Sequence, residues 1–353
     1  MSIAMKISDI PAFQLAALRK GGVIPAHPLA LTAERELDER RQRALSRYYL
    51  DAGANGMAVA VHTTQFEIRD HGLLEPVLSL AAEEAARHGS NPILVAGAIG
   101  KTEQAVREAE LARSRGYHAV LLGLAAMKDA TEDELIAHCR AVADVMPVIG
   151  FYLQVAVGGQ PLPYSFWRRF AEIENVVAIK MAPFHRYRTL DVVRAVVDAR
   201  AEDRITLYTG NDDHIVADLM TRFTFPRDGK PVSVRIKGGL LGHWAVWTKK
   251  AVELLADIHE RPDSRTASEW LELDARTTDA NGVLFDVANN SAGCIAAIHE
   301  VLRRQRLLEG IWCLNPDETM GPGQVEELDR IARDYPELND DDFVRANLER
   351  WLA

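Results

Sequence analysis

The chain has 353 residues, of which 48% are hydrophobic and 26% charged, a balance typical of a globular protein that excludes a disordered or fibrous one. Its 41 basic and 51 acidic side chains give a formal net charge of −10, which disfavours nucleic acid and anionic membranes as partners because like charges repel. Three cysteines without a CxxC pair argue against a disulfide framework, and no apolar run approaches the length of a membrane span. We therefore expect a cytoplasmic protein.

Eight short apolar runs recur along the first 240 residues, and segments with helical patterns separate them. The runs cover residues 22–26, 56–61, 92–99, 119–124, 148–153, 176–181, 205–210 and 234–239. Continuous apolar strands that alternate with amphipathic helices are typical of a parallel sheet covered by helices. Eight such units favour a closed (β/α)8 barrel, the TIM barrel, over a doubly wound sheet, which usually has fewer strands.

Helix signals and the C-terminal third complete the predicted architecture. The segment from Thr32 to Gly53 reads as a helix with an N-cap and a C-cap, and Thr131–Glu134 form a capping box before another helix. Residues 247–353 have helical periodicity and no run of the strand type. We predict a barrel domain at 1–246 and a C-terminal helical extension at 247–353.

Lys180 interrupts the apolar run 176–181, which predicts a buried strand. Because burial of an unpaired ammonium is costly, we expect the pKa of this side chain to fall, which makes a neutral amine available near neutral pH. Such an amine can attack a ketone or aldehyde carbon and form a Schiff base. The structural alternative is a lysine whose charged end reaches solvent.

Other polar residues also follow predicted strands, where the functional groups of a barrel lie. Tyr152 is near the end of the fifth run, and we expect its phenol to relay protons to the intermediate at Lys180. A core tyrosine bonded to a backbone carbonyl is the alternative. The remaining candidates for substrate binding are His27, His62, Thr63, Thr64, Gln154, Gly210, Asn211, Gly239 and Leu241.

Metal chemistry is the main competing hypothesis, because His27, His62 and Asp212 all follow predicted strands. No pair of histidines has the HxxxH or HEXXH spacing of a helical metal motif, and the GxGxxG string of dinucleotide sites is absent. We therefore predict neither a metal nor an organic cofactor.

The order of these motifs resembles the dihydrodipicolinate synthase and N-acetylneuraminate lyase family of pyruvate-handling barrels. The match is carried by VHTTQF around Thr63 and Thr64, GFYLQ around Tyr152, AIKMA around Lys180, TGNDD at 209–213 and IKGGLLG at 236–242. The resemblance implies an imine between Lys180 and pyruvate or a related 2-oxo acid, proton relay by Tyr152 and a carboxylate site at Thr63 and Thr64. It also implies a homodimer or homotetramer.

Two departures from the family's lysine-pathway synthases narrow the expected activity. No arginine stands between Tyr152 and Arg168, and GLAAMKDA at 123–130 occupies the place of a tyrosine that those synthases share between subunits. We expect a class I lyase or aldolase that acts on a 2-oxo acid and an aldehyde, or dehydrates a sugar acid, rather than a true dihydrodipicolinate synthase. The alternatives are a non-catalytic binding protein for 2-oxo acids or sugar acids, and a metal-assisted lyase.

Overall fold

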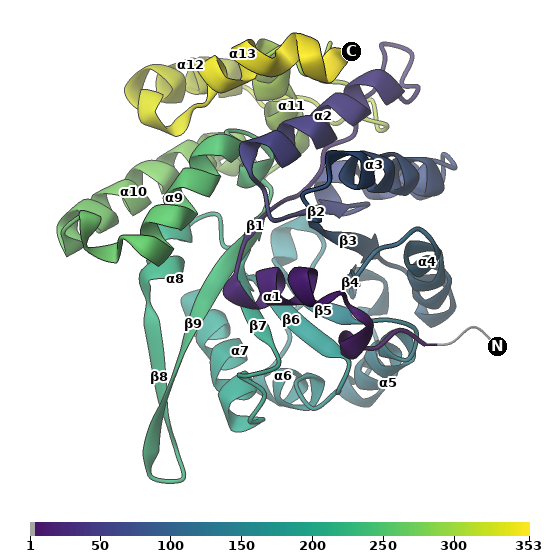
Figure 1. The fold of residues 1–353 in the computed structure, drawn as a ribbon, viewed down its shortest axis with the longest axis vertical. Helices are drawn as coiled ribbons and strands as arrows, with labels where there is room; N and C mark the ends of the chain where they lie inside the picture. Colours follow the sequence, from purple (N-terminus) through teal and green to yellow (C-terminus); the bar gives the residue numbers. More distant parts are fainter. Residues whose placement is uncertain (1–3) are drawn as a thin grey trace. The chain divides into compact units, whose positions relative to one another are not determined.

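The structure is a computed structural model that describes residues 4–353. The chain divides into two compact units, and Figure 1 shows their elements in chain colours. The first unit comprises the residues up to 21 together with 93–211 and 218–239, and the second comprises 22–92, 212–217 and 240–353. The predicted extension at 247–353 therefore lies entirely within the second unit.

The first unit is built on a parallel sheet in which the strand order is β9, β7, β6, β5, β4, β3. Its strands are β3 (Ile93–Ala98), β4 (Ala119–Leu122), β5 (Val148–Leu153), β6 (Val176–Ala182), β7 (Thr206–Thr209), β8 (Arg222–Arg227) and β9 (Lys230–Leu241). Its helices are α1 (Ala12–Lys20), α4 (Thr102–Ser114), α5 (Glu132–Ala143), α6 (Tyr164–Phe170) and α7 (Arg186–Asp198). The six-residue helix α8 (Ile215–Met220) precedes β8.

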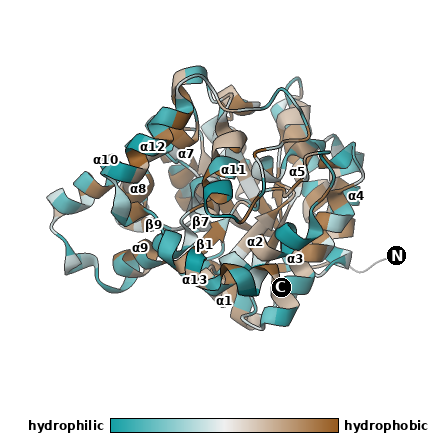
Figure 2. Cartoon of the chain, turned by 90° about the horizontal axis from the view of Figure 1, so that it is seen from above, coloured by the Kyte–Doolittle hydropathy of each residue, from teal (hydrophilic) through white to brown (hydrophobic). Residues whose placement is uncertain are grey.

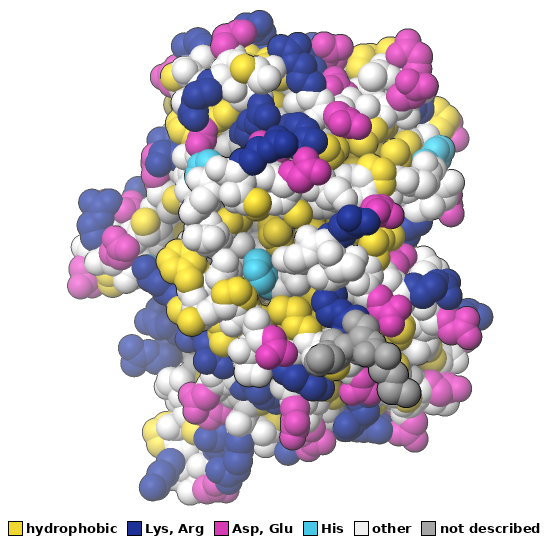
Figure 3. Space-filling model, turned by 45° about the vertical axis from the view of Figure 1, so that its right-hand side comes forward, with side chains coloured by type: hydrophobic (Ala, Val, Ile, Leu, Met, Phe, Trp, Pro, Cys, Tyr) yellow, Lys and Arg dark blue, Asp and Glu magenta, His cyan; other side chains and the backbone are white. Residues whose placement is uncertain are grey.

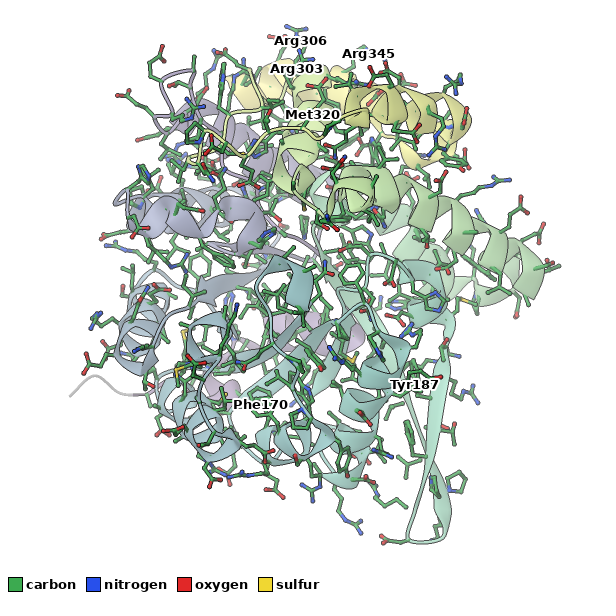
Figure 4. All side chains as sticks on the ribbon, turned by 180° about the vertical axis from the view of Figure 1, so that it is seen from behind. Phe170, Tyr187, Arg303, Arg306, Met320 and Arg345 are labelled. Carbon is green, nitrogen blue, oxygen red and sulfur yellow. The ribbon has the colours of Figure 1, made fainter. Side chains whose placement is uncertain are left out.

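The packing of β5 on α6 defines the two faces of this sheet. A Cβ on Gly150 would lie 2.6 Å from the ring of Phe170, so Gly150 faces α6. Phe170, labelled in Figure 4, packs on Trp167 with ring centroids 5.5 Å apart, and both side chains are buried. Since side chains alternate along a strand, the even-numbered residues of β5 face the helices and the odd-numbered residues face the inner side of the sheet.

The second unit contains two short strands and a group of helices. The strands β1 (Val23–Pro25) and β2 (Gly56–Val59) are joined by a parallel bridge between Ala26 and Ala58. The helices are α2 (Glu39–Ala52), α3 (Leu74–His88), α9 (Thr248–Glu260), α10 (Ala267–Leu284), α11 (Cys294–Arg304), α12 (Gln324–Asp334) and α13 (Asp341–Leu352). All regular elements in residues 242–353 are helical, which confirms the predicted helical character of the C-terminal third.

The predicted fold class, a (β/α)8 barrel followed by C-terminal helices, is confirmed. Each of the eight predicted runs overlaps one of the strands β1–β7 and β9. The capping box is also present, with the Thr131 hydroxyl accepting from the Glu134 backbone N–H. The predicted helix start at Thr32 is wrong, because Asp38 is the N-cap of α2. The residues between them form a turn in which the Thr32 backbone N–H donates to the Glu36 carbonyl.

The helices carry both hydrophobic and hydrophilic side chains. Figure 2 shows hydrophobic and hydrophilic residues interleaved along the helices, as amphipathic helices require. Both acidic and basic side chains are spread over the face shown in Figure 3. Within residues 4–353, no helix combines the length and the hydropathy that a membrane crossing requires.

Candidate active site

Lys180 is the one buried lysine among the residues that the structure describes, with 8% of its surface exposed. It lies on β6 between two register partners, Phe151 on β5 and Tyr208 on β7. Side chains in register on parallel strands share a face, so Lys180 lies on the inner side of the sheet with Phe151. The Nζ atom is 4.4 Å from the centroid of the Phe151 ring, a cation–π distance.

Gly210 provides the room that the Lys180 side chain occupies. A Cβ added at Gly210 would lie 2.5 Å from Cε of Lys180 and 2.9 Å from Cβ of Ala182. Carbon atoms in ordinary contact are about 3.5–4.0 Å apart, so no side chain fits at this position unless its neighbours move. The structure thus brings two of the predicted site residues, Lys180 and Gly210, into direct contact.

The Tyr152 side chain on β5 points to the opposite face of the sheet from the Lys180 side chain on β6. Val148 pairs with Val176, and pairing at this constant offset would set Tyr152 beside Lys180. The register shifts after Val148, so Ile149 pairs with Ala178 and Phe151 pairs with Lys180. A one-residue shift moves every later side chain to the other face, which is how a phenylalanine comes to occupy the position beside the amine.

The Tyr152 hydroxyl is engaged in the helix layer. It donates to the Leu162 carbonyl and accepts from the Leu162 backbone N–H, both at 3.1 Å, and its ring lies 5.2 Å from that of Trp167. Burial raises the pKa of Tyr152. The Tyr152 hydroxyl is therefore not joined to Lys180, and these contacts do not support the expected proton relay between them.

Asn211 belongs to a buried polar network behind the end of β7. Its amide nitrogen donates to Thr189 at 3.2 Å and to the Asp218 carboxylate at 3.0 Å, and its amide oxygen accepts from the Phe184 backbone N–H. Asp218 is fully buried and also accepts from the Thr209 hydroxyl at 2.7 Å. The Asn211 side chain thus holds the loop after β6, where Phe184 has a φ of 49°, and positions the neighbouring Gly210.

The other two predicted site residues of the first unit, Gly239 and Gln154, make backbone contacts. Gly239 pairs in register with Thr209, which places β9 beside the end of β7. Gln154 follows β5 in a short loop, and its carbonyl accepts from the Gly159 N–H at 2.9 Å. Binding of a substrate by either residue stays a prediction.

His27, expected to bind substrate, has both ring nitrogens engaged within the second unit. Nδ1 lies 2.8 Å from the Pro28 carbonyl oxygen, and Nε2 lies 2.9 Å from the Ser46 hydroxyl. Burial lowers the pKa of His27 to about 4, so the ring is neutral near pH 7. This environment is that of a core histidine, and we do not retain His27 as a substrate ligand.

The VHTTQF segment forms a tight turn after β2. Residues His62–Thr64 form one 3-10 turn, and the buried Thr64 hydroxyl donates to the His27 carbonyl at 2.7 Å while it accepts from the Val61 N–H. The Thr64 hydroxyl proton therefore stabilises the turn. Thr63 is buried beside it, and the His62 ring lies 5.8 Å from that of Phe66.

Leu241 ends β9 within the second unit, where it is fully buried and its carbonyl accepts from the Ala26 N–H at 3.2 Å. Across residues 4–353, no three His, Cys, Asp or Glu side chains gather in an arrangement that would hold a metal ion. The metal hypothesis named His27, whose ring nitrogens already have the partners described above.

The fold is a (β/α)8 barrel, and Lys180 on β6 is buried. A buried amine on a barrel strand can act as a nucleophile, which places this protein with the barrels in which a lysine is the candidate nucleophile. The sequence model of the Dihydrodipicolinate synthetase family matches residues 19–222, more than half of the chain. The chain belongs to this family.

The curated relatives are distant from the chain and only partly aligned with it. The 4-hydroxy-tetrahydrodipicolinate synthase of Halorhodospira halophila is 25% identical over 178 residues, which are 50% of this chain and 57% of the relative. The enzyme of the same name from Desulforudis audaxviator is 27% identical over 195 residues, 54% of this chain and 63% of the relative. The chain thus spans less than two thirds of the length of these relatives.

Solved structures match over nearly the whole chain. Dihydrodipicolinate synthase from Oceanobacillus iheyensis has a TM-score of 0.73 at 16% identity and covers 92% of this chain and 99% of its own. CdNal from Clostridium difficile, solved in complex with mannosamine, has a TM-score of 0.72 at 15% identity, with coverages of 89% and 99%. At such identities the likeness establishes the fold.

The sequence patterns did not identify three residues that shape this site. Phe151 was hidden by the register shift, which no local pattern shows. Tyr208, the other register partner of Lys180, donates its hydroxyl to the Leu18 carbonyl at 2.8 Å. Asp218 lies in a short helix, and only its burial reveals its role.

Proposed function

We propose that this protein is a class I lyase or aldolase in which Lys180 forms an imine with pyruvate or a related 2-oxo acid. The observation that carries the proposal is the amine itself, which is buried on the inner face of the sheet beside Phe151 and accommodated by Gly210. Membership of the Dihydrodipicolinate synthetase family supports the same chemistry.

The proposed reaction begins when the neutral amine of Lys180 attacks the C2 carbonyl of the 2-oxo acid and water is lost. The resulting imine withdraws electrons from the adjacent carbon, so an enamine forms and attacks an aldehyde, or the reverse cleavage occurs. The register partners of Lys180 offer a hydrocarbon ring at Phe151 and a phenol at Tyr208 that is bonded to Leu18. In this proposal the carboxylate of the substrate and water carry the proton transfers.

The rest of the proposal relies on the family resemblance. The turn of Thr63 and Thr64 is proposed for the substrate carboxylate, with Thr63 as the side-chain donor because the Thr64 hydroxyl is bonded to His27. The absence of an arginine between Tyr152 and Arg168 supports an acceptor other than that of the lysine pathway. A homodimer or homotetramer is proposed on the same basis, and a cytoplasmic location is proposed from the cysteine pattern of the sequence.

A second candidate function is a 2-oxo-acid or sugar-acid binding protein without turnover. It is favoured by one observation, the Phe151 ring beside Lys180 in a place where a hydroxyl would serve proton transfer. Such a protein would gain thermal stability from its ligand and form no product.

The test is a panel of 2-oxo acids, each incubated with the protein and borohydride, followed by an aldehyde screen with the best donor. The lyase proposal predicts irreversible mass addition to the wild type and not to Lys180→Ala, together with consumption of the donor when the right aldehyde is present. Adduct formation without turnover across the aldehyde panel would favour the binding protein. Absence of any adduct, with all panel members, would refute the lyase proposal, and absence of thermal stabilisation by any panel member would refute the binding protein.

A further inference from the structure

The connection between β7 and β9 departs from the pattern of one covering helix after each strand. Its helix, α8, has six residues and a length of about 9 Å. The β8–β9 hairpin follows, turns at Asp228 and Gly229, and extends past the end of α7 (Figure 1). Phe223 and Ile236 are buried on one face of this hairpin, and β8 contacts α7. The hairpin thus covers the flank that a helix would otherwise fill.

A cavity of about 320 Å³ lies at the base of the hairpin, and every residue that lines it belongs to the first unit. Its apolar wall includes Val196 of α7 and Leu207 of β7. Its polar wall is formed on the hairpin by Arg222, Ser233, Arg235 and Lys237. At about 30 Å³ per water molecule the cavity has room for roughly ten waters, which is the lower end of the range for small-molecule sites.

Arg222 and Arg235 give the cavity a concentrated positive charge. They are direct register partners on the antiparallel strands, and both are exposed. Like charges in this arrangement repel each other. Neither arginine has an acidic partner within 4.0 Å among residues 4–353, whereas Arg227 near the hairpin turn is paired with Glu202 at 2.7 Å. An anion between Arg222 and Arg235 would relieve the repulsion and accept bidentate hydrogen bonds.

Two carboxylates also contribute to the wall of the cavity. Glu202 and Asp203 line it, and Arg227 occupies only the Oε1 atom of Glu202. The Oε2 atom of Glu202 is buried and has no hydrogen-bond partner in the part of the chain that the structure describes. A ligand that suits both kinds of group carries an acid group for the arginines and hydroxyl donors for the two carboxylates.

We propose that this cavity is a binding site, separate from Lys180, for a small hydroxylated organic acid with one carboxylate or phosphate group. Leu207 lines the cavity and is next to Tyr208, the register partner of Lys180, so the ligand contacts the strand beside the candidate active site. The acid group binds Arg222 and Arg235, with Lys237 adding charge, and the hydroxyl groups face Glu202 and Asp203.

The test is isothermal titration calorimetry at constant ionic strength with two matched pairs of probes. Gluconate is compared with hexanoate, and glycerol 3-phosphate is compared with propyl phosphate, so each pair differs in hydroxyl groups and the pairs differ in acid group. The titrations use Lys180→Ala protein, which cannot form an imine. Their outcome is therefore independent of the proposed lyase activity.

The proposal predicts saturable binding of at least one hydroxylated probe. Its apolar counterpart should bind with an affinity that is lower by about tenfold or more. The Arg222→Ala/Arg235→Ala variant should lose about tenfold or more in affinity, while the exposed pair Arg107→Ala/Arg194→Ala should match the parent. If the first variant folds poorly, Arg235→Gln decides the same question. No saturable binding, equal binding of the apolar probes, or unchanged affinity in the cavity variants would overturn the proposal.

Discussion

Substitution of Gly210 by alanine tests whether the position of the Lys180 amine controls reactivity. The new methyl group would lie 2.5 Å from Cε of Lys180, about 1 Å inside an ordinary carbon contact, so the end of the side chain must move by about that distance. A misplacement of 1 Å at a reacting group costs about a hundredfold in rate. The contact of 2.9 Å with Cβ of Ala182 is less easily relieved and should cost about 1–3 kcal/mol of stability.

The assay is the rate of borohydride-trapped adduct with pyruvate, followed by intact-protein mass spectrometry, beside a thermal unfolding curve for each protein. Gly282→Ala is the matched control, because a Cβ there meets nothing within 4 Å and alanine is the better helix former in α10. This control should trap at the wild-type rate and unfold at the same or a higher temperature. A Gly210→Ala protein that is folded and traps as fast as the wild type would refute the steric argument.

Three further predictions concern buried side chains. Phe151→Tyr sets a hydroxyl beside Lys180 and should speed adduct formation by about tenfold or more, whereas Tyr152→Phe should leave the trapping rate unchanged and cost about 1 kcal/mol in urea unfolding. Asp218→Ala should cost about 3 kcal/mol in the same measurement, because Thr209, Asn211 and Arg186 lose their common acceptor; a wild-type value would contradict the network's structural role. The folded-state pKa of His27 is about 4, below its ordinary value of 6.5, so the unfolded chain binds more protons in acid. Its stabilising contribution is complete above pH 6.5 and falls by about 2 kcal/mol between roughly pH 7 and pH 5. Urea unfolding at both pH values should show a pH dependence that is smaller in His27→Gln by about this amount, and an equal pH dependence would count against the burial effect.

The parallel strands were predictable because buried strands in a barrel are continuously apolar, and each apolar run of the sequence overlaps one of them. The hairpin was missed although its turn carries a recognisable signal. Asp228 and Gly229 have φ values of 51° and 74°, and an Asp-Gly pair between apolar alternations is typical of a two-residue hairpin turn. The predicted strand covers only residues 234–239 and does not include β8. The residues of β8 alternate between more exposed and less exposed positions, so they form no apolar run.

The candidate site was predictable only in part. A lysine inside an apolar run is a local signal, and the burial of Lys180 agrees with it. The face on which Tyr152 lies depends on a register shift between two strands, which is decided by packing across the sheet and leaves no local pattern. The partners of His27 and Thr64 are likewise set by contacts between distant segments.

The most direct measurement is the location of a trapped adduct by peptide mapping after incubation with pyruvate and borohydride. The chain has nine lysines, and Lys180 is the buried one in the described structure. The account predicts a single modification, on the peptide that contains Lys180. Its absence there, or modification spread over the exposed lysines, would contradict the imine mechanism.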